Sequence, residues 1–425
     1  MTRTGTPPGG SPAVLAVAGL VGGAARAALL GAAAPPALAN GYLAVLTVAS
    51  RAGRRRTDGG GAAAAGHRIA VLVPAHDEEP IIGSTVGSIV GQDYPAALRT
   101  VHVVADNCTD RTAEVAQHHG AEVHVRDDPL APGKGPALGW LVPRVLAERP
   151  RPDAFVVIDA DTTMLPSFLR QVDAALDGPH SAWQGYYTVR DPDLSPSTAF
   201  RHAALILRHY IRPLGRTALG GSTGLFGNGM VFRTDLLARR GFSAHLTEDL
   251  ELQLELLLDG ELVGFLPEAV VEAEMPTTLA GAESQNERWE AGRLQLARRF
   301  VPELTRRALR PGTAHRAAHV DAALDQLVPP LSVLGAVTAA AAAAACLPRM
   351  GRSRTGRIGR RLAWASVAAL AFHVLAGLRW AGAPRATYRA LLRAPQIAWW
   401  KLRLWLRVLA RPDEVRWTRT QRNQP

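Results

Sequence analysis

The sequence predicts an α/β domain built on a mixed, mainly parallel sheet flanked by helices, with transmembrane or interfacial helices at both ends of the chain. Two observations predict it. From residue 69 onward, short apolar runs alternate with helix-length stretches, the pattern of parallel strands joined by crossover helices. The charge is also divided, because residues 67–300 hold 21 Lys and Arg against 31 Asp and Glu, out of 48 and 37 in the 425-residue chain.

This division of charge argues against nucleic acid as the partner. The chain as a whole has a formal net charge of +11, but the excess of arginine lies in the Ala-, Leu- and Trp-rich ends and not on the predicted domain. Basic segments beside apolar ones are typical of contact with anionic lipid headgroups. The two cysteines, Cys108 and Cys346, provide neither a disulfide framework nor the spacing of a zinc site.

The first 66 residues form the predicted N-terminal membrane segment and linker. Residues 11–50 are almost without charge, with Arg26 as the interruption, and a cluster of four arginines follows at 51–56. This pattern predicts a membrane span that ends near residue 50 with its basic end in the cytoplasm. Prolines within the run leave its start open, and residues 59–66 have the Gly/Ala composition of a linker.

Residues 67–310 form the predicted catalytic domain. In its first half we expect strands and helices in alternation, with strands at 69–73, 101–105, 122–125 and 155–158 and helices at 80–90, 111–118, 134–147 and 166–176. Its second half, 183–274, mixes strands with helices near 196–213 and 247–258. A long, arginine-rich amphipathic helix is expected over 279–308.

Residues 311–425 form the predicted C-terminal membrane region. Residues 327–348 and 362–380 are each close to the length that crosses a bilayer. The first is mostly alanine and is followed by the arginine-rich loop 349–361, so a span, a re-entrant segment and an interfacial helix all stay open for it. Over 385–411 arginines recur every four residues with tryptophans between, which favours a helix in the headgroup plane over an ordinary surface helix.

Three predicted strands are followed by carboxylates. Asp159 and Asp161 come directly after 155–158 and point to the same side in an extended segment, and Asp106 ends the second strand. Asp77 and Glu78 follow the first strand. The carboxyl edge of an open α/β sheet is where ligands bind, and hard oxygen ligands suit Mg²⁺ or Mn²⁺, which can bridge a diphosphate. The alternative for each motif is a solvated turn or a helix cap.

Thr247, Glu248 and Asp249 open a predicted helix. A threonine cap and acids in the first turn stabilise a helix on their own. The functional alternative is that one carboxylate acts as a general base for an acceptor hydroxyl.

Gln285, Arg288 and Trp289 share one face of the next long helix. An arginine beside an aromatic ring can bind a phosphate and cover a sugar, although packing explains the same pattern. The glycine-rich segments 220–224 and 227–229 allow either close approach to a ligand or plain turns.

In this order the motifs resemble those of membrane-bound family 2 glycosyltransferases, the inverting nucleotide-sugar enzymes related to cellulose, hyaluronan and poly-N-acetylglucosamine synthases and to ceramide glucosyltransferase. The resemblance covers about residues 69–300. It is carried by Val-Pro-Ala-His-Asp-Glu at 73–78, Val-Ala-Asp-Asn-Cys-Thr-Asp at 104–110, Gly-Lys-Gly at 133–135, Asp-Ala-Asp at 159–161, Thr-Glu-Asp at 247–249 and Gln-x-x-Arg-Trp at 285–289. His76 departs from the Tyr or Phe often found there.

The resemblance implies a GT-A fold, a UDP-sugar donor and Mg²⁺ or Mn²⁺. It implies Asp249 as the catalytic base and Asp159 and Asp161 as metal ligands. The donor would be bound by Pro74, Asp77, Glu78, Asp106, Lys134, Asp159, Gln285, Arg288 and Trp289, and the acceptor by Gly229, Glu248 and Trp289.

The function expected from this resemblance is sugar transfer from UDP to a lipid or glycan acceptor at the plasma membrane, with the catalytic domain in the cytoplasm. The expected product is a β-linked exopolysaccharide or cell-envelope glycan, and the alternative is a single-transfer glycolipid. A degenerate, non-catalytic membrane scaffold is the non-enzyme alternative. A dinucleotide oxidoreductase is excluded because residues 74–81 hold no glycine for a Gly-x-Gly-x-x-Gly turn.

Overall fold

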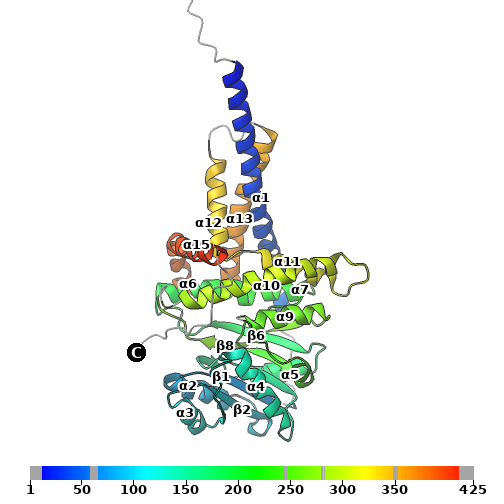
Figure 1. Ribbon diagram of the computed structural model, residues 1–425, viewed down its shortest axis with the longest axis vertical. Helices are drawn as coiled ribbons and strands as arrows, with labels where there is room; N and C mark the ends of the chain where they lie inside the picture. Colours follow the sequence, from blue (N-terminus) through cyan, green and yellow to red (C-terminus); the bar gives the residue numbers. More distant parts are fainter. Residues whose placement is uncertain are drawn as a thin grey trace, which may run out of the picture.

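The computed structural model describes residues 12–57, 66–243, 245, 247–278, 281, 283–347 and 353–410. The molecule has three tiers along its long axis (Figure 1). A sheet domain lies at one end, a layer of helices runs across the middle, and upright helices stand at the other end.

The sheet has eight strands in the order β3-β2-β1-β4-β7-β6-β8-β5. Its strands are β1 (Ile69–Ala75), β2 (Arg99–Asp106), β3 (Glu122–Arg126), β4 (Ala154–Val157), β5 (Thr162–Met164), β6 (Ala182–Val189), β7 (Met230–Arg233) and β8 (Val263–Ala273). The first four strands of this order are parallel, β7 is antiparallel to both β4 and β6, β8 is parallel to β6, and β5 is antiparallel to β8. The prediction of a mixed, mainly parallel sheet is therefore confirmed.

Helices cover both faces of this sheet because its buried strands are apolar on both sides. They are α2 (Glu79–Val90), α3 (Thr112–His118), α4 (Lys134–Ala147), α5 (Phe168–Leu176), α8 (Thr234–Arg240) and α9 (Glu248–Leu258). Val71 of β1 packs in a core with Val86 of α2, whereas the next residue, Leu72, packs in a second core with Leu138 of α4. β1 therefore packs against helices on both faces of the sheet.

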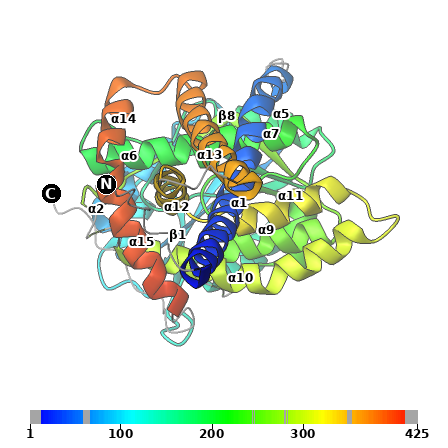
Figure 2. The same ribbon diagram turned by 90° about the horizontal axis from the view of Figure 1, so that it is seen from above.

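The transverse layer joins the sheet to the upright helices (Figure 2). It contains α6 (Pro196–Leu205), the π-helical turn η2 (Ile206–Ile211), α7 (Arg212–Ala218), α10 (Glu283–Leu309), α11 (Arg316–Leu327), α14 (Arg385–Ala390), the 3₁₀ turn η4 (Leu391–Arg393) and α15 (Ala394–Ala410). Residues 279, 280 and 282 of the predicted amphipathic helix lie outside the described part, and α10 begins at Glu283.

The expected single helix over 385–411 is divided in the structure. It breaks at η4, next to Pro395, which has no main-chain N–H to continue the helical hydrogen bonds. Leu404 and Val408 of α15 are buried against Ala291 of α10, whereas Trp399 is 61% exposed. The helix thus packs on the protein with one face and offers tryptophan on another, and Arg411 lies outside the described residues.

The upright helices are α1 (Pro12–Thr57), α12 (Leu331–Ala345) and α13 (Arg354–Trp380). Among the described residues, 27–54 of α1 and the whole of α13 are long and apolar enough to cross a membrane. α11 and α12 would count as a third span if taken together, but they meet at 74°. The predicted linker at 59–66 and the loop at 349–361 fall largely or partly outside the described residues.

Candidate active site

A cavity of about 1270 Å³ opens at the carboxyl edge of the sheet and extends through the transverse layer to the upright helices. Pro74 and Asp106 line its sheet end, Asp249 lines its middle, and apolar residues of α12 and α13 line its far end. A typical small-molecule site occupies ~300–1,000 Å³, so this cavity has room for more than one ligand.

The structure brings most of the predicted site residues together. Those that line the cavity are Pro74, Glu78, Asp106, Lys134, Asp159, Asp161, Glu248, Asp249, Gln285, Arg288 and Trp289. They come from the carboxyl ends of β1 and β2, from the loops after β1 and β4, from the first turns of α4 and α9 and from the first two turns of α10. Their convergence follows from the topology, since the carboxyl ends of neighbouring parallel strands meet at one edge.

Two predicted residues do not line the cavity. Asp77 turns its carboxylate to Thr109, whose main-chain N–H donates to Oδ1 at 2.7 Å. Gly229 occupies a turn with φ of 70°, and its N–H donates to the carbonyl of Val157 at 2.9 Å. Both residues hold local backbone in place, and a direct contact of either with donor or acceptor stays a prediction.

Asp106 is fixed at the sheet end by a partner that the sequence did not reveal. The buried guanidinium of Arg126, on β3, forms an ion pair with Asp106 Oδ1, and the N–H of Gly133 donates to Oδ2 at 3.3 Å. The same guanidinium also contacts Asp128 at 2.7 Å. The carboxylate is therefore oriented before any ligand binds.

Lys134 connects two of the motifs. Its Nζ donates to Asp159 Oδ1 at 2.5 Å and to the carbonyl oxygen of Gly227. Burial disfavours its charged form, but the carboxylates of Asp159, Glu248 and Asp249 outweigh burial and raise the pKa of Lys134. Gly227 has φ of 78°, and a side chain there would meet Asp249 Oδ2 at 3.4 Å and Lys134 Nζ at 3.6 Å.

Asp159 and Asp161 provide a donor set that fits a divalent cation. Both carboxylates line the cavity, and carboxylate oxygens are the ligands that Mg²⁺ and Mn²⁺ prefer. Glu274, which the sequence reasoning missed, lines the cavity beside them because its N–H donates to the main-chain oxygen of Asp161 at 3.3 Å.

Glu248 and Asp249 lie in the first turn of α9. The N–H of Leu250 donates to Asp249 Oδ1 at 2.8 Å, whereas Thr247 forms no side-chain cap on this helix. Burial and the neighbouring Asp249 raise the pKa of Glu248 to about 7. Burial also raises the pKa of Asp249, against the opposing effects of Lys134 and Arg208. A carboxylate whose pKa is raised accepts a proton more readily near neutral pH.

Arginines of the transverse layer line the middle of the cavity, and sequence reasoning did not assign them. Arg208 lies on the turn η2 and Arg293 on α10. The signal that could have found this region is a run of arginines four residues apart, Arg208, Arg212 and Arg216, within an apolar helix.

The far end of the cavity is apolar. It is lined by residues of α12, α13 and α15, among them Leu331, Gly335, Ala339, Val367, Leu370, Val374, Ile397 and Trp400. In the view from above, α12 stands between α6, α13 and α15 (Figure 2). The cavity therefore joins a carboxylate-rich edge to an apolar pocket between upright helices.

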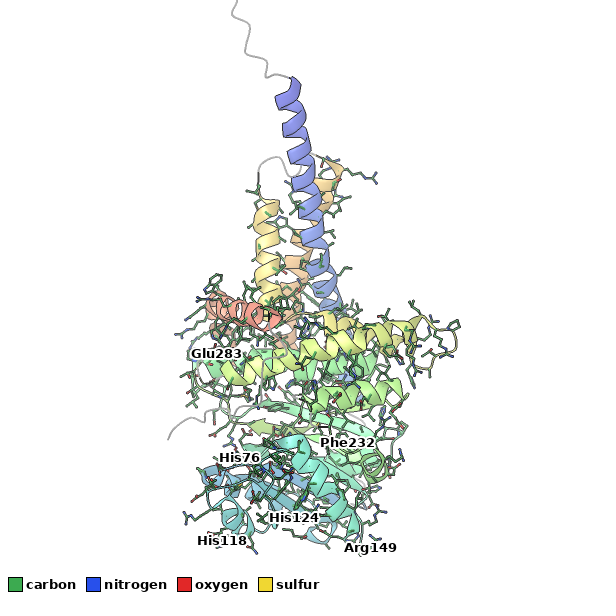
Figure 3. The ribbon with its side chains drawn as sticks, in the orientation of Figure 1. His76, His118, His124, Arg149, Phe232 and Glu283 are labelled. Atoms are coloured by element: carbon green, nitrogen blue, oxygen red, sulfur yellow. The ribbon has the colours of Figure 1, made fainter. Side chains whose placement is uncertain are left out.

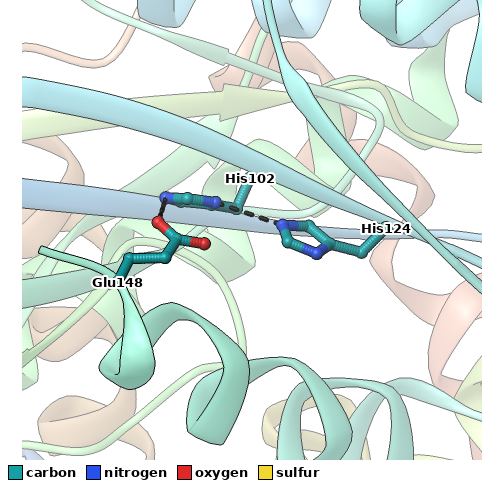
Figure 4. Close-up of side chains that lie close together, drawn as sticks. All are labelled: His102, His124 and Glu148. Carbon is teal, nitrogen blue, oxygen red and sulfur yellow. Dashed lines mark hydrogen bonds and ion pairs between the residues drawn. The ribbon is translucent and has the colours of Figure 1, made fainter.

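A second group of titratable side chains lies away from the cavity. Figure 3 shows His124 farther from the transverse layer than His76, which lines the cavity. His102 Nδ1 lies 3.3 Å from His124 Nε2, and its Nε2 lies 3.8 Å from Glu148 (Figure 4). Burial, assisted by His124, lowers the pKa of His102 to about 4. This neutral, hydrogen-bonded histidine belongs to the fold rather than to the site.

Residues 67–292 match the family described as glycosyltransferase like family 2. The chain is similar to a beta-monoglucosyldiacylglycerol synthase of Synechocystis sp., with 31% identity over 54% of this chain and 48% of that one. It is similar to an enzyme of the same name from Nostoc sp., with 28% identity over 53% of this chain and 49% of that one. The match thus spans about half the length of these two relatives.

A solved structure also resembles the chain. It is the mannosyltransferase from Pyrobaculum calidifontis in complex with GDP-Man and Mn²⁺, which has 21% identity and a TM-score of 0.49. The superposition covers 82% of this chain and 99% of that one.

Proposed function

The chain belongs to glycosyltransferase like family 2, and from this premise we propose that it transfers a sugar from a UDP-sugar to the hydroxyl of a membrane lipid. The observation that carries the proposal is the continuous cavity, which has carboxylates and Lys134 at the sheet end and an apolar pocket between α12, α13 and α15 at the other. A nucleotide-sugar suits the first part, and acyl or isoprenoid chains suit the second.

A single transfer to lipid is favoured over an exopolysaccharide. Two relatives are named beta-monoglucosyldiacylglycerol synthases, which supports a lipid acceptor and makes glucose the first sugar to test. The apolar lining of the far end supports the same choice, because a passage for a growing polysaccharide would need polar walls. The polymeric product expected from the sequence is therefore the second candidate.

In the proposed mechanism the donor lies at the sheet end, where Asp106 is held by Arg126 and Gly133. Asp249 takes the proton of the acceptor hydroxyl while the hydroxyl oxygen attacks the anomeric carbon. The bond from that carbon to the diphosphate breaks in the same step, so the configuration inverts. Arg288 and Lys134 neutralise the charge that develops on the leaving group.

A divalent cation fits the donor set of Asp159 and Asp161. When bound there, Mg²⁺ or Mn²⁺ would supply positive charge to the leaving diphosphate. Lys134 holds Asp159 through Nζ, so it also positions this part of the site.

The upright helices would hold the catalytic domain at the plasma membrane, with the sheet in the cytoplasm where nucleotide-sugars are made. The two apolar helices, the exposed Trp399 and the basic chain ends support this arrangement.

The direct test is Asp249→Asn in the full chain. Membranes that carry it should lose lipid glycosylation from labelled UDP-glucose by at least ~100-fold, because the amide cannot take the proton. Binding of UDP, measured by calorimetry on the purified protein, should persist. Asp127→Asn, at an exposed carboxylate, is the matched control.

The size of the product distinguishes the two candidates. One organic-soluble product supports the lipid acceptor, and a ladder of water-soluble products supports the polysaccharide. Normal transfer by Asp249→Asn would refute the assignment of the base.

A further inference from the structure

Several arginines line the middle of the cavity, and three of them form no direct ion pair with a described carboxylate. We define the arginine cluster as Arg201, Arg208 and Arg293, which all line the cavity. Among the described residues none of the three has a carboxylate within ion-pair distance. Arg201 donates to Gln285 Oε1 at 3.2 Å, and Arg293 donates to main-chain oxygens of Asp325 and Val328.

The carboxylates nearest the cluster are already paired. Asp325 lies 3.3 Å from Arg212 and 2.8 Å from Arg216. Glu290 lies 2.8 Å from Lys401 Nζ. Asp325 and Glu290 therefore act on Arg208 and Arg293 only at longer range, and the direct hydrogen-bonding positions of the two guanidiniums toward an anion stay open to a ligand in the cavity.

Arg208 is the member that faces the open space most directly. Of the three, Arg208 alone has an exposed side chain, and it lines the cavity. Burial and the nearby Arg293 lower the pKa of Arg208 to about 10, which leaves it charged at neutral pH. It lies on a π-helical turn, an irregularity often found at functional sites.

The cluster and the predicted metal ligands belong to different tiers, because η2 and α10 lie in the transverse layer and Asp159 and Asp161 follow β4 in the sheet (Figure 1). The charged groups that act on Arg208 are on α7, α10 and α11, namely Arg212, Arg293, Glu290 and Asp325. Asp249 interacts electrostatically with Lys134 and Asp159 and also with Arg208. A charge held by the cluster would therefore belong to the acceptor and not to the departing diphosphate.

The position of the arginine cluster along the long axis of the molecule also favours an acceptor as its ligand. η2 and α10 belong to the transverse layer between the sheet and the upright, apolar helices (Figure 1). If those helices span the bilayer, the transverse layer lies at the level of the lipid phosphates.

We propose that the acceptor is an anionic lipid, in which a phosphate beside the glycosylated hydroxyl is bound by Arg208 and Arg293. This deepens the proposed function and rests on it, since it names the class of lipid that the same site takes. The proposed acceptor differs from neutral diacylglycerol, whose headgroup would leave the arginines without an anionic partner. Guanidinium groups bind phosphate oxygens in a bidentate manner, which also orients the neighbouring hydroxyl toward Asp249.

The test compares two acceptors of equal chain length in detergent micelles with the full chain. Phosphatidylglycerol carries a phosphodiester and free hydroxyls, and diacylglycerol carries a hydroxyl without charge. We expect kcat/KM for phosphatidylglycerol to exceed that for diacylglycerol at least tenfold. The ratio should fall by tenfold or more in Arg208→Gln, mainly through KM, and should be partly retained in Arg208→Lys.

Arg298→Gln is the matched control, because Arg298 is an exposed arginine on the same helix as Arg293. It should leave the ratio unchanged. Using the ratio removes any effect of Arg208 on the pKa of Asp249, since that effect acts on both lipids.

The outcomes separate the two proposals. Equal or better use of diacylglycerol, or a preference for phosphatidylglycerol that survives Arg208→Gln, would overturn the anionic acceptor and keep lipid glycosylation. Label transferred to added sn-glycerol 3-phosphate in preference to either lipid would show that the cluster binds a soluble phosphate, and would refute the lipid source. Transfer to neither lipid, with a water-soluble polymer formed instead, would end both proposals.

Discussion

Glu248 and Asp249 are adjacent carboxylates in one buried environment, and their joint titration sets the pH range in which a base is available. Burial raises the pKa of both, and that of Glu248 reaches about 7. The base must be ionised to accept a proton. We therefore expect kcat/KM to be highest above about pH 7 and to fall as the pH drops and the pair takes up a proton.

Replacing one of these carboxylates should shift the acid limb of the pH profile of kcat/KM. In Glu248→Gln the repulsion between the two adjacent carboxylates is lost, so the pKa of the remaining Asp249 falls. The acid limb of kcat/KM should shift to lower pH by about one unit. Glu255→Gln, on the same helix but paired with Arg299 at 3.6 Å, should leave the limb in place. An unchanged limb in Glu248→Gln would show that the two carboxylates titrate independently.

The acidic site residues were predictable from sequence because each follows an apolar strand or opens a helix. Asp106 and Asp159 could be placed at one edge from strand periodicity alone. Their partners could not, since Arg126 reaches Asp106 from the neighbouring strand β3 and Lys134 reaches Asp159 from the start of α4. The role proposed for Arg208 could not be predicted from sequence either, because it depends on the nearby carboxylates being paired with other basic side chains.

At the scale of elements, the upright helix α1 is joined to the transverse layer by close backbone contact with α7. A Cβ added at Gly53 of α1 would lie 2.1 Å from the carbonyl oxygen of Leu214, and one added at Gly215 of α7 would lie 2.3 Å from that of Leu46. Contacts this short exist only where the side chain is a hydrogen atom. The two glycines therefore let the helices approach closely enough to fix the catalytic domain on α1.

Gly53→Ala should force these helices apart. We expect a loss of about 1–3 kcal/mol in the free energy of unfolding, because a methyl group is inserted into a filled contact. The measurement is thermal unfolding of the full chain in detergent, followed by tryptophan fluorescence. Gly41→Ala is the control on the same helix, where an added Cβ has nothing within 4 Å. Equal unfolding temperatures for the two variants would contradict the close contact.

Most helices and strands could be predicted where apolar residues recur with the period of that element. α4 begins and ends where expected, at Lys134 and Ala147, and β1 to β4 overlap their predicted runs. The strands from β6 to β8 were expected only as a mixture within 183–274, and β5 was not predicted. β5 has three residues and pairs with β8, more than a hundred residues later, so its pairing is decided by tertiary contacts and not by local pattern.

At the scale of the whole molecule, the cavity is continuous from the sheet to the upright helices, so the proposed donor and acceptor sites belong to different tiers. A change in the upper tier should affect the lipid without affecting the nucleotide. Gly335 on α12 offers this change, since it lines the apolar end and an added Cβ would have Leu370 as an ordinary neighbour at 3.9 Å.

Gly335→Phe should fill part of the apolar end. We expect KM to rise at least fivefold for an acceptor with long acyl chains, because its chains lose buried apolar contact. An acceptor with six-carbon chains should be used as well as before, and binding of UDP should not change. Ala340→Phe, exposed on the same helix and outside the cavity lining, controls for the bulk of the ring. If Gly335→Phe impairs both acceptors equally, the lipid chains lie elsewhere and the upright helices serve as an anchor alone.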